Sequence, residues 1–113
     1  MKNVRFKFWN LEITSEALVL HFYDDKIMIP LNAIKGYHLD WQLHDPVFAK
    51  KWWFLVLTVV LKDGSEECGP VAFVKFNYLD DGHSRQHIEH TINAALDAAI
   101  ARKAALAQKM ICI

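Results

Sequence analysis

The hydrophobic pattern divides the chain into two unequal parts. Over about the first two-thirds, short apolar runs alternate with turn residues, whereas residues 84–110 form one amphipathic stretch rich in alanine. Several strands followed by a single terminal helix are typical of a small α+β domain. We therefore predict one domain over residues 1–113: an antiparallel β-barrel or sandwich of six to seven strands, at about residues 4–78, closed by one long C-terminal helix.

The strand signals differ in what they imply about burial. Residues 36–44 alternate strictly, with Tyr37, Leu39, Trp41 and Leu43 on one face and His38, Asp40, Gln42 and His44 on the other. Residues 52–61 are instead apolar at nearly every position, which predicts a strand covered on both faces, by the barrel interior on one side and by a helix or a second subunit on the other. The last strand is expected to continue through Val71 to Tyr78.

The helical stretch is longer than the sheet it would cover. Ser84 is the preferred N-cap residue, with Asp81 as the competing choice. A helix over residues 84–110 would reach about 40 Å, whereas a strand of seven or eight residues spans only ~25 Å. We therefore expect the helix to overhang the sheet from about Arg102, and to self-associate or bind a protein partner through the apolar residues of that overhang: Ala104, Leu106, Ala107, Met110 and Ile111.

Charge and cysteine content exclude several classes of protein. Thirteen basic and thirteen acidic residues give no net charge, which argues against binding to nucleic acid. Cys68 and Cys112 have no paired spacing, as expected of reduced thiols rather than a disulfide framework. The longest apolar run is far short of the ~20 residues that span a bilayer, so no transmembrane segment is expected. The N-terminal residues interleave charge with apolar side chains and do not form a signal peptide. These features predict a soluble, cytoplasmic protein.

Two segments resemble a known family. Residues 13–20 followed by residues 26–37, with the sequence Ile29-Pro30-Leu31 and a buried position at Ile34, look like the opening hairpin of the bacterial pleckstrin-homology-like and GRAM-like domains. The later hairpin around Asp63-Gly64 and the C-terminal helix also occupy the expected positions. The resemblance covers about residues 10–100 and implies a small barrel closed by the helix, serving as a binding platform.

The loops differ from those of the phosphoinositide-binding members of that family. The resemblance implies lysines and arginines around the first hairpin loop, but this chain has Ser15-Glu16 there and Asp24-Asp25 in the next loop. Acidic loops repel phosphate. Headgroup binding by the usual route is therefore not expected.

Three histidines form the clearest metal-ligand pattern. His83, His87 and His90 are spaced to share one helical face near the helix start, where Asp80 or Asp81 could complete a zinc site. The same spacing is also that of the solvent face of an ordinary helix, which is the simpler interpretation. We predict no cofactor and no metal centre, with these histidines as the weaker alternative.

Catalytic patterns are sparse. His38, Asp40 and His44 share one strand face and could form an acid–base pair or a metal site. That pattern equally describes the exposed face of an antiparallel strand. No nucleophile lies at a diagnostic spacing, and four glycines in the whole chain leave no glycine-rich phosphate loop. We therefore predict that the protein is not an enzyme.

The segment from Pro46 to Trp53 has the composition of a contact site. It combines an apolar tip at Phe48 with two lysines and an aromatic pair, which suit a membrane interface or a protein partner: Phe48, Lys50, Lys51, Trp52 and Trp53. Alternatively, Phe48 folds back on the core and the lysines solvate a hairpin end. The sequence thus predicts a non-enzymatic interaction or assembly domain that self-associates through its helix. The alternative is a peripheral membrane or small-ligand-binding module that uses the loop around Phe48.

Overall fold

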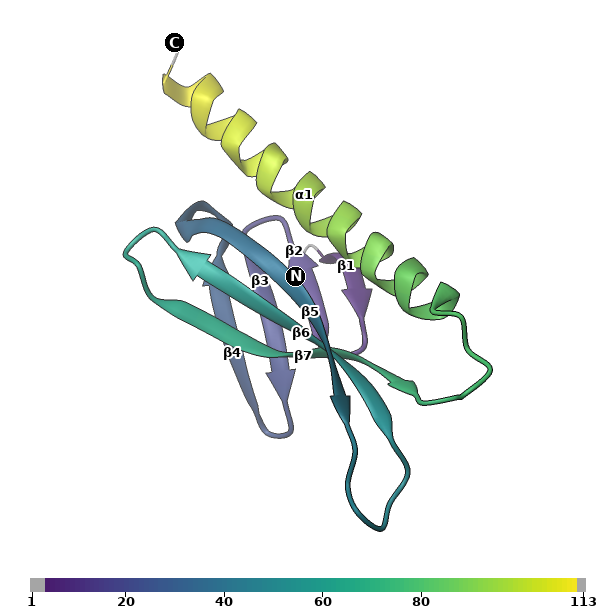
Figure 1. Cartoon of the computed structure of the whole chain (residues 1–113). Helices are drawn as coiled ribbons and strands as arrows, with labels where there is room; N and C mark the ends of the chain where they lie inside the picture. Colours follow the sequence, from purple (N-terminus) through teal and green to yellow (C-terminus); the bar gives the residue numbers. More distant parts are fainter. Residues whose placement is uncertain (1–3, 112–113) are drawn as a thin grey trace.

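A computed structural model describes the backbone of residues 4–111 and the side-chain environments of residues 6–105. The described chain forms two antiparallel sheets followed by one long α-helix (Figure 1). The α+β class and the order of strands before helix are therefore as the hydrophobic pattern predicts.

The first sheet contains four strands in sequence order. They are β1 (Val4–Phe8), β2 (Leu11–Thr14), β3 (Ala17–Phe22) and β4 (Asp25–Pro30). Two-residue turns join successive strands, because Phe8 pairs with Leu11 and Phe22 pairs with Asp25. The chain then leaves this sheet through a single 3₁₀ turn, η1 (Leu31–Ala33).

The second sheet contains three longer strands. They are β5 (Ile34–His44), β6 (Trp52–Leu61) and β7 (Glu66–Lys75), again in sequence order. In Figure 1 the connection between β5 and β6, residues 45–51, extends well away from the rest of the molecule. We call this connection the distal hairpin. The last strand ends at Lys75, so the predicted continuation to Tyr78 is wrong.

The two sheets share one core but no ladder. Among the described strands no hydrogen-bonded pair joins β4 to β5 or β1 to β7, so the sheets do not close into a single hydrogen-bonded barrel. Fully buried side chains come from both sheets and from the helix, so the inner faces surround one apolar cluster. The largest of these side chains are Leu11, Ile13, Leu18, Leu20, Leu55, Leu57, Ile92 and Leu96.

Two close contacts tie the sheets together beside β7. The Asn10 side-chain amide donates a hydrogen bond to the Pro70 carbonyl oxygen at 2.7 Å, which joins the β1–β2 turn to the second sheet. Gly69 lies against the ring of Phe22, and a Cβ at this position would come within 2.5 Å of that ring. A side chain at this position would therefore force the Phe22 ring to move from its place against β7.

The strand β6 is covered on only one face. Leu55, Leu57 and Val59 are buried, whereas Trp52 is exposed and Phe54 is only partly buried on the opposite face. The described chain therefore places no helix over the outer face, and the alternative cover, a second subunit, stays a prediction. The outer face of the second sheet keeps an apolar surface that is partly open to solvent.

The helix α1 (His83–Ile111) begins two residues earlier than an N-cap at Ser84 predicts, because an N-cap residue precedes the first helical residue. The Asp81 carboxylate accepts a hydrogen bond from the His83 backbone amide, and Gly82 adopts a left-handed φ of +88° just before the first turn. The competing cap residue, Asp81, thus satisfies a backbone donor of the first turn. Ser84 lies inside the helix, so its assignment as N-cap is wrong.

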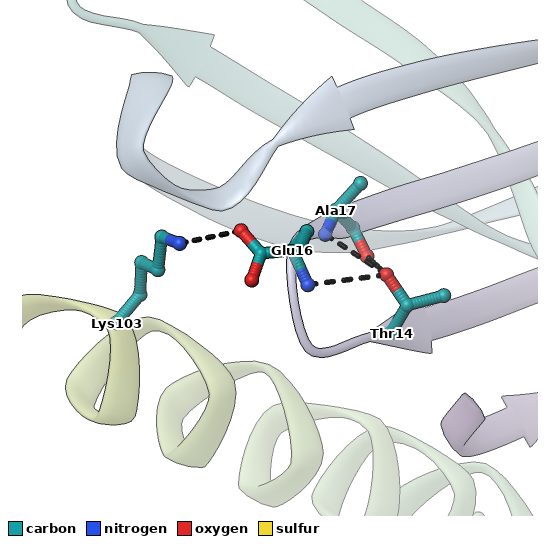
Figure 2. A network of polar contacts seen from close by, with 4 residues as sticks. All are labelled: Thr14, Glu16, Ala17 and Lys103. Carbon is teal, nitrogen blue, oxygen red and sulfur yellow. Dashed lines mark hydrogen bonds and ion pairs between the residues drawn. The ribbon is translucent and has the colours of Figure 1, made fainter. Parts of the chain in front are cut away.

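The helix is fixed to the sheets at two polar contacts besides its apolar stripe. The Tyr37 hydroxyl donates to the Asp97 carboxylate at 2.6 Å and also contacts Asn93. Near the other end, the Lys103 ammonium lies 2.6 Å from the Glu16 carboxylate, in a turn that Thr14 stabilises by accepting two backbone amides (Figure 2). This exposed ion pair contributes at most about 1 kcal/mol, so it orients the helix more than it stabilises it.

The last turns of α1 run past both sheets (Figure 1). Ala104 and Ala105 are exposed, and the backbone stays helical through Ile111. The predicted overhang therefore exists. None of the helices among residues 4–111 combines the length and the apolarity that crossing a membrane requires.

Candidate functional site

The distal hairpin presents the apolar tip expected of a contact loop. Val47 is 86% exposed and Phe48 is 98% exposed, so Phe48 does not fold back on the core. Lys51 lies beside the hairpin base and pairs with Asp45 at 3.6 Å. Lys50 is also exposed. The structure therefore excludes a Phe48 side chain folded back on the core and is compatible with an exposed contact loop.

The two tryptophans that follow the hairpin do not form one surface. Because successive side chains of a strand point to opposite faces, Trp52 lies on the outer face of the second sheet and Trp53 on the inner face. Each belongs to a separate group of aromatic side chains. The predicted contact residues of this segment are therefore divided between two surfaces.

We define the inner aromatic cluster as Trp53, Phe76 and Tyr78. The Phe76 ring packs edge-on against Tyr78 with the ring centroids 5.0 Å apart. The Arg85 guanidinium lies 4.2 Å above the centre of the Trp53 ring, and the Lys51 ammonium lies 5.3 Å from that of Phe76. In cation–π contacts of this kind, cationic side chains of the same chain are attracted to the electron-rich faces of the rings. This cluster joins the start of α1 to the second sheet and serves as a structural contact.

We define the outer aromatic cluster as Trp9, Trp52, Phe54 and Phe73. These four rings line a cleft of about 350 Å³ on the outer face of the second sheet. Trp9 stacks on Phe73 with centroids 4.9 Å apart, and Phe54 meets Phe73 edge-on at the same distance. Cross-strand pairing explains the grouping, because Phe54 is opposite Phe73 in the β6–β7 register. The cleft is shallow and wide open to solvent, and its volume lies at the lower limit of those typical of small-molecule sites.

Trp9 reaches this cleft from the first sheet. It lies in the β1–β2 turn with a left-handed φ of +52° and remains 52% exposed. A bulky residue in this conformation is a true backbone outlier, and such residues persist where the surroundings hold them and are often found at functional sites. Here the hydrogen bond from Asn10 to Pro70 and the stacking on Phe73 hold the turn.

The helix histidines are arranged as a solvent face. His83, His87 and His90 are all exposed, and His83 pairs with Asp81 at 3.2 Å. Among the described residues no group of three or more potential metal ligands is placed to hold an ion. The arrangement matches the simpler interpretation of the spacing.

One of the two strand histidines, His44, lies at the border of the outer aromatic cluster. His38, Asp40 and His44 are exposed on one face of β5, as the alternation predicts. His44 packs edge-on against Phe54 with centroids 5.5 Å apart and is opposite Trp52 in the strand register. His44 therefore borders an aromatic cleft.

Three predicted contact residues fall on the overhang of α1. The helical backbone includes Leu106, Met110 and Ile111, while their side chains lie outside the part that the structure describes. The last side chains with described contacts belong to Lys103 and to Ala104, which borders a shallow pocket beside η1. The assignment of these three residues to an interface stays a prediction.

Of the four residues of the outer aromatic cluster, only Trp52 is among the contact residues predicted from the sequence. Trp9 and Phe73 lie 64 positions apart in the chain. The register of β6 with β7 and the approach of the β1–β2 turn bring them together. The only available signal was the break after Trp9, where Asn10 interrupts the alternation.

Comparisons with known proteins do not place the chain in a family. No protein family, no curated protein and no solved structure matches it.

Proposed function

We propose that this chain is a cytoplasmic, non-enzymatic domain of the pleckstrin-homology-like type that assembles with itself or with another protein through the end of α1. The order of four strands, three strands and a helix supports the family resemblance. The observation that carries the assembly proposal is the overhang, since α1 continues beyond its last described contact with the sheets (Figure 1).

The chemistry of the overhang supports an apolar interface. From Ala104 to Ile111 the helix extends by about 10 Å, roughly two turns. Leu106 and Met110 are four residues apart in the sequence, as are Ala107 and Ile111, which is the spacing of positions on one helical face. An apolar stripe on a projecting helix is the usual basis of helix-to-helix association.

The mass of the full chain in solution tests this proposal. Light scattering on a sizing column should give an oligomer for the full chain and a monomer for Leu106→Glu and Met110→Glu. Arg102→Gln, which changes an exposed residue on the same helix, should leave the mass unchanged. A monomeric full chain that also retains no partner on a pull-down column would contradict the proposal.

A second candidate function rests on the distal hairpin. Phe48 and Val47 are almost fully exposed, with Lys50 and Lys51 close by, which suits a peripheral membrane or small-ligand-binding module. Cosedimentation with vesicles of phosphatidylcholine and phosphatidylglycerol tests the membrane version. The wild-type chain should sediment with the vesicles and Phe48→Asp should stay in the supernatant. Equal sedimentation of the two proteins would exclude the loop as a membrane contact.

A further inference from the structure

The two aromatic clusters differ in whether cations of the chain lie over their rings. In the inner cluster, Arg85 lies over Trp53 and Lys51 lies near Phe76 and Tyr78. Within the described residues, no lysine or arginine lies over any ring of the outer aromatic cluster. Among the described side chains, cations therefore lie over the rings on the inner side of β6 and not over those of the aromatic cleft on the outer side.

The edge of the open cleft is positively charged. Lys75 is the cross-strand partner of Trp52, and both side chains lie on the outer face of the sheet. Lys50 precedes Trp52 by two residues, and its side chain lowers the pKa of Lys75 by hydrogen bonding and by charge. Two ammonium groups at one edge repel each other, and an anion between them would relieve that repulsion.

The nearby carboxylate is already engaged. Asp45 is paired with Lys51, and no ion pair among the described residues includes Lys50 or Lys75. A third cation at this edge would add to the repulsion, so the cleft is unsuited to quaternary ammonium ligands despite its four aromatic rings. An anion would instead neutralise the two lysines.

We propose that the outer aromatic cluster binds a small amphipathic anion, whose apolar or aromatic body occupies the cleft between Trp9, Trp52, Phe54 and Phe73 and whose carboxylate, sulfonate or phosphate contacts Lys50 and Lys75. The proposal goes beyond both candidate functions, because the cleft includes neither the tip of the distal hairpin nor the overhang of α1. Free organic acids and the headgroup region of anionic lipids both supply this chemistry.

The four tryptophans provide an internal control for binding. Trp9 and Trp52 line the cleft, whereas Trp41 packs against the core and Trp53 lies on the inner face under Arg85. In a ¹⁵N-labelled full chain, each indole N–H gives its own NMR signal. Titration with 2-naphthoate should shift the signals of Trp9 and Trp52 and leave those of Trp41 and Trp53 in place.

Matched ligands and variants test the charge. The neutral 2-naphthalenemethanol and the cationic 2-naphthylmethylammonium should bind more weakly than 2-naphthoate. Lys75→Gln should weaken 2-naphthoate binding by about fivefold, the effect of losing one exposed ion pair. Lys26→Gln, at an exposed lysine of β4, should have no effect. Equal binding of all three ligands, or equal shifts of all four indole signals, would overturn the proposal.

A second titration, with the phosphatidylglycerol vesicles, distinguishes a free organic acid from a lipid headgroup as the source of the anion. Shifts of Trp9 and Trp52 with 2-naphthoate support a free organic acid, and shifts with vesicles alone support a lipid headgroup. No shift with either refutes the site. Because Phe48 does not line the cleft, Phe48→Asp should retain 2-naphthoate binding even if it abolishes sedimentation with vesicles. Loss of naphthoate binding in that variant would place the site at the loop and overturn the cleft.

Discussion

Two aromatic residues with the same backbone conformation should respond in opposite directions to replacement by glycine. Trp9 and Tyr23 both follow a strand in a two-residue turn, with left-handed φ values of +52° and +48°. The conformation costs a non-glycine residue about 1–2 kcal/mol. Glycine avoids that cost but loses about 0.5–1 kcal/mol more in backbone entropy on folding. The backbone gain is therefore about 0.5–1 kcal/mol at each position.

The contacts of the two side chains make the effects of the glycine substitutions differ. Tyr23 is fully exposed, so Tyr23→Gly should raise the free energy of unfolding by the whole backbone gain. Trp9 is about half buried, which places roughly 100 Å² of its ring against the protein. That area is worth about 2.5 kcal/mol, and stacking on Phe73 adds about 1 kcal/mol. Trp9→Gly should therefore lower the free energy of unfolding by about 2–3 kcal/mol.

Urea unfolding followed by far-UV circular dichroism measures both changes without depending on tryptophan fluorescence. Tyr23→Ala is the matched control, because it removes the exposed ring but keeps a non-glycine residue in the left-handed conformation. This variant should leave the free energy of unfolding nearly unchanged. If Tyr23→Gly were less stable than the wild-type chain, or if both glycine variants shifted in the same direction, the assignment of strain and stacking would be wrong.

Three further predictions concern the junctions between elements. Burial and the hydrogen bond to Asp97 raise the pKa of Tyr37 well above its usual value. The stabilisation that Tyr37 contributes should be fully present below about pH 10, the usual pKa of a tyrosine in an unfolded chain. It should be lost as the pH rises through the raised pKa of the folded state. Tyr37→Phe should therefore remove this decline from melting temperatures measured at alkaline pH. Gly69→Ala should cost about 1–3 kcal/mol because its Cβ meets the Phe22 ring, as measured by urea unfolding. Ile92→Ala should cost about 2–5 kcal/mol because it leaves a cavity beneath α1, with the loss seen as a lower midpoint in the same assay.

The sequence was sufficient for the elements whose signal is local. Strict alternation in residues 36–44 gave β5 and its two faces, and helical spacing gave α1 and its overhang. Both patterns depend only on the repeat of the backbone itself. The N-cap was harder because Asp81 and Ser84 are both good caps, and the choice depends on the left-handed turn at Gly82.

Sites that depend on the pairing register between strands could not be predicted from local sequence patterns. Phe54 and Phe73 meet because of a bulge that shifts the β6–β7 register between Leu55 and Val56. A shift of one residue in pairing would send Phe73 to the opposite face. The apolar run of β6 likewise suggested burial on both faces, whereas its outer face forms part of a cleft. Apolar composition alone does not distinguish a second layer of protein from a binding surface.

The order of the elements has a consequence for the synthesis of the chain. Every ladder in both sheets joins strands that are adjacent in the sequence, so each hairpin can close locally as it leaves the ribosome. The contacts that complete the core come from Ile92 and Leu96, and those that orient the helix join residues as far apart as Glu16 and Lys103. Until the final quarter of the chain is made, the sheets have an open apolar face. An apolar face that is exposed during that interval favours misassembly, so rapid formation of α1 after synthesis would protect the chain.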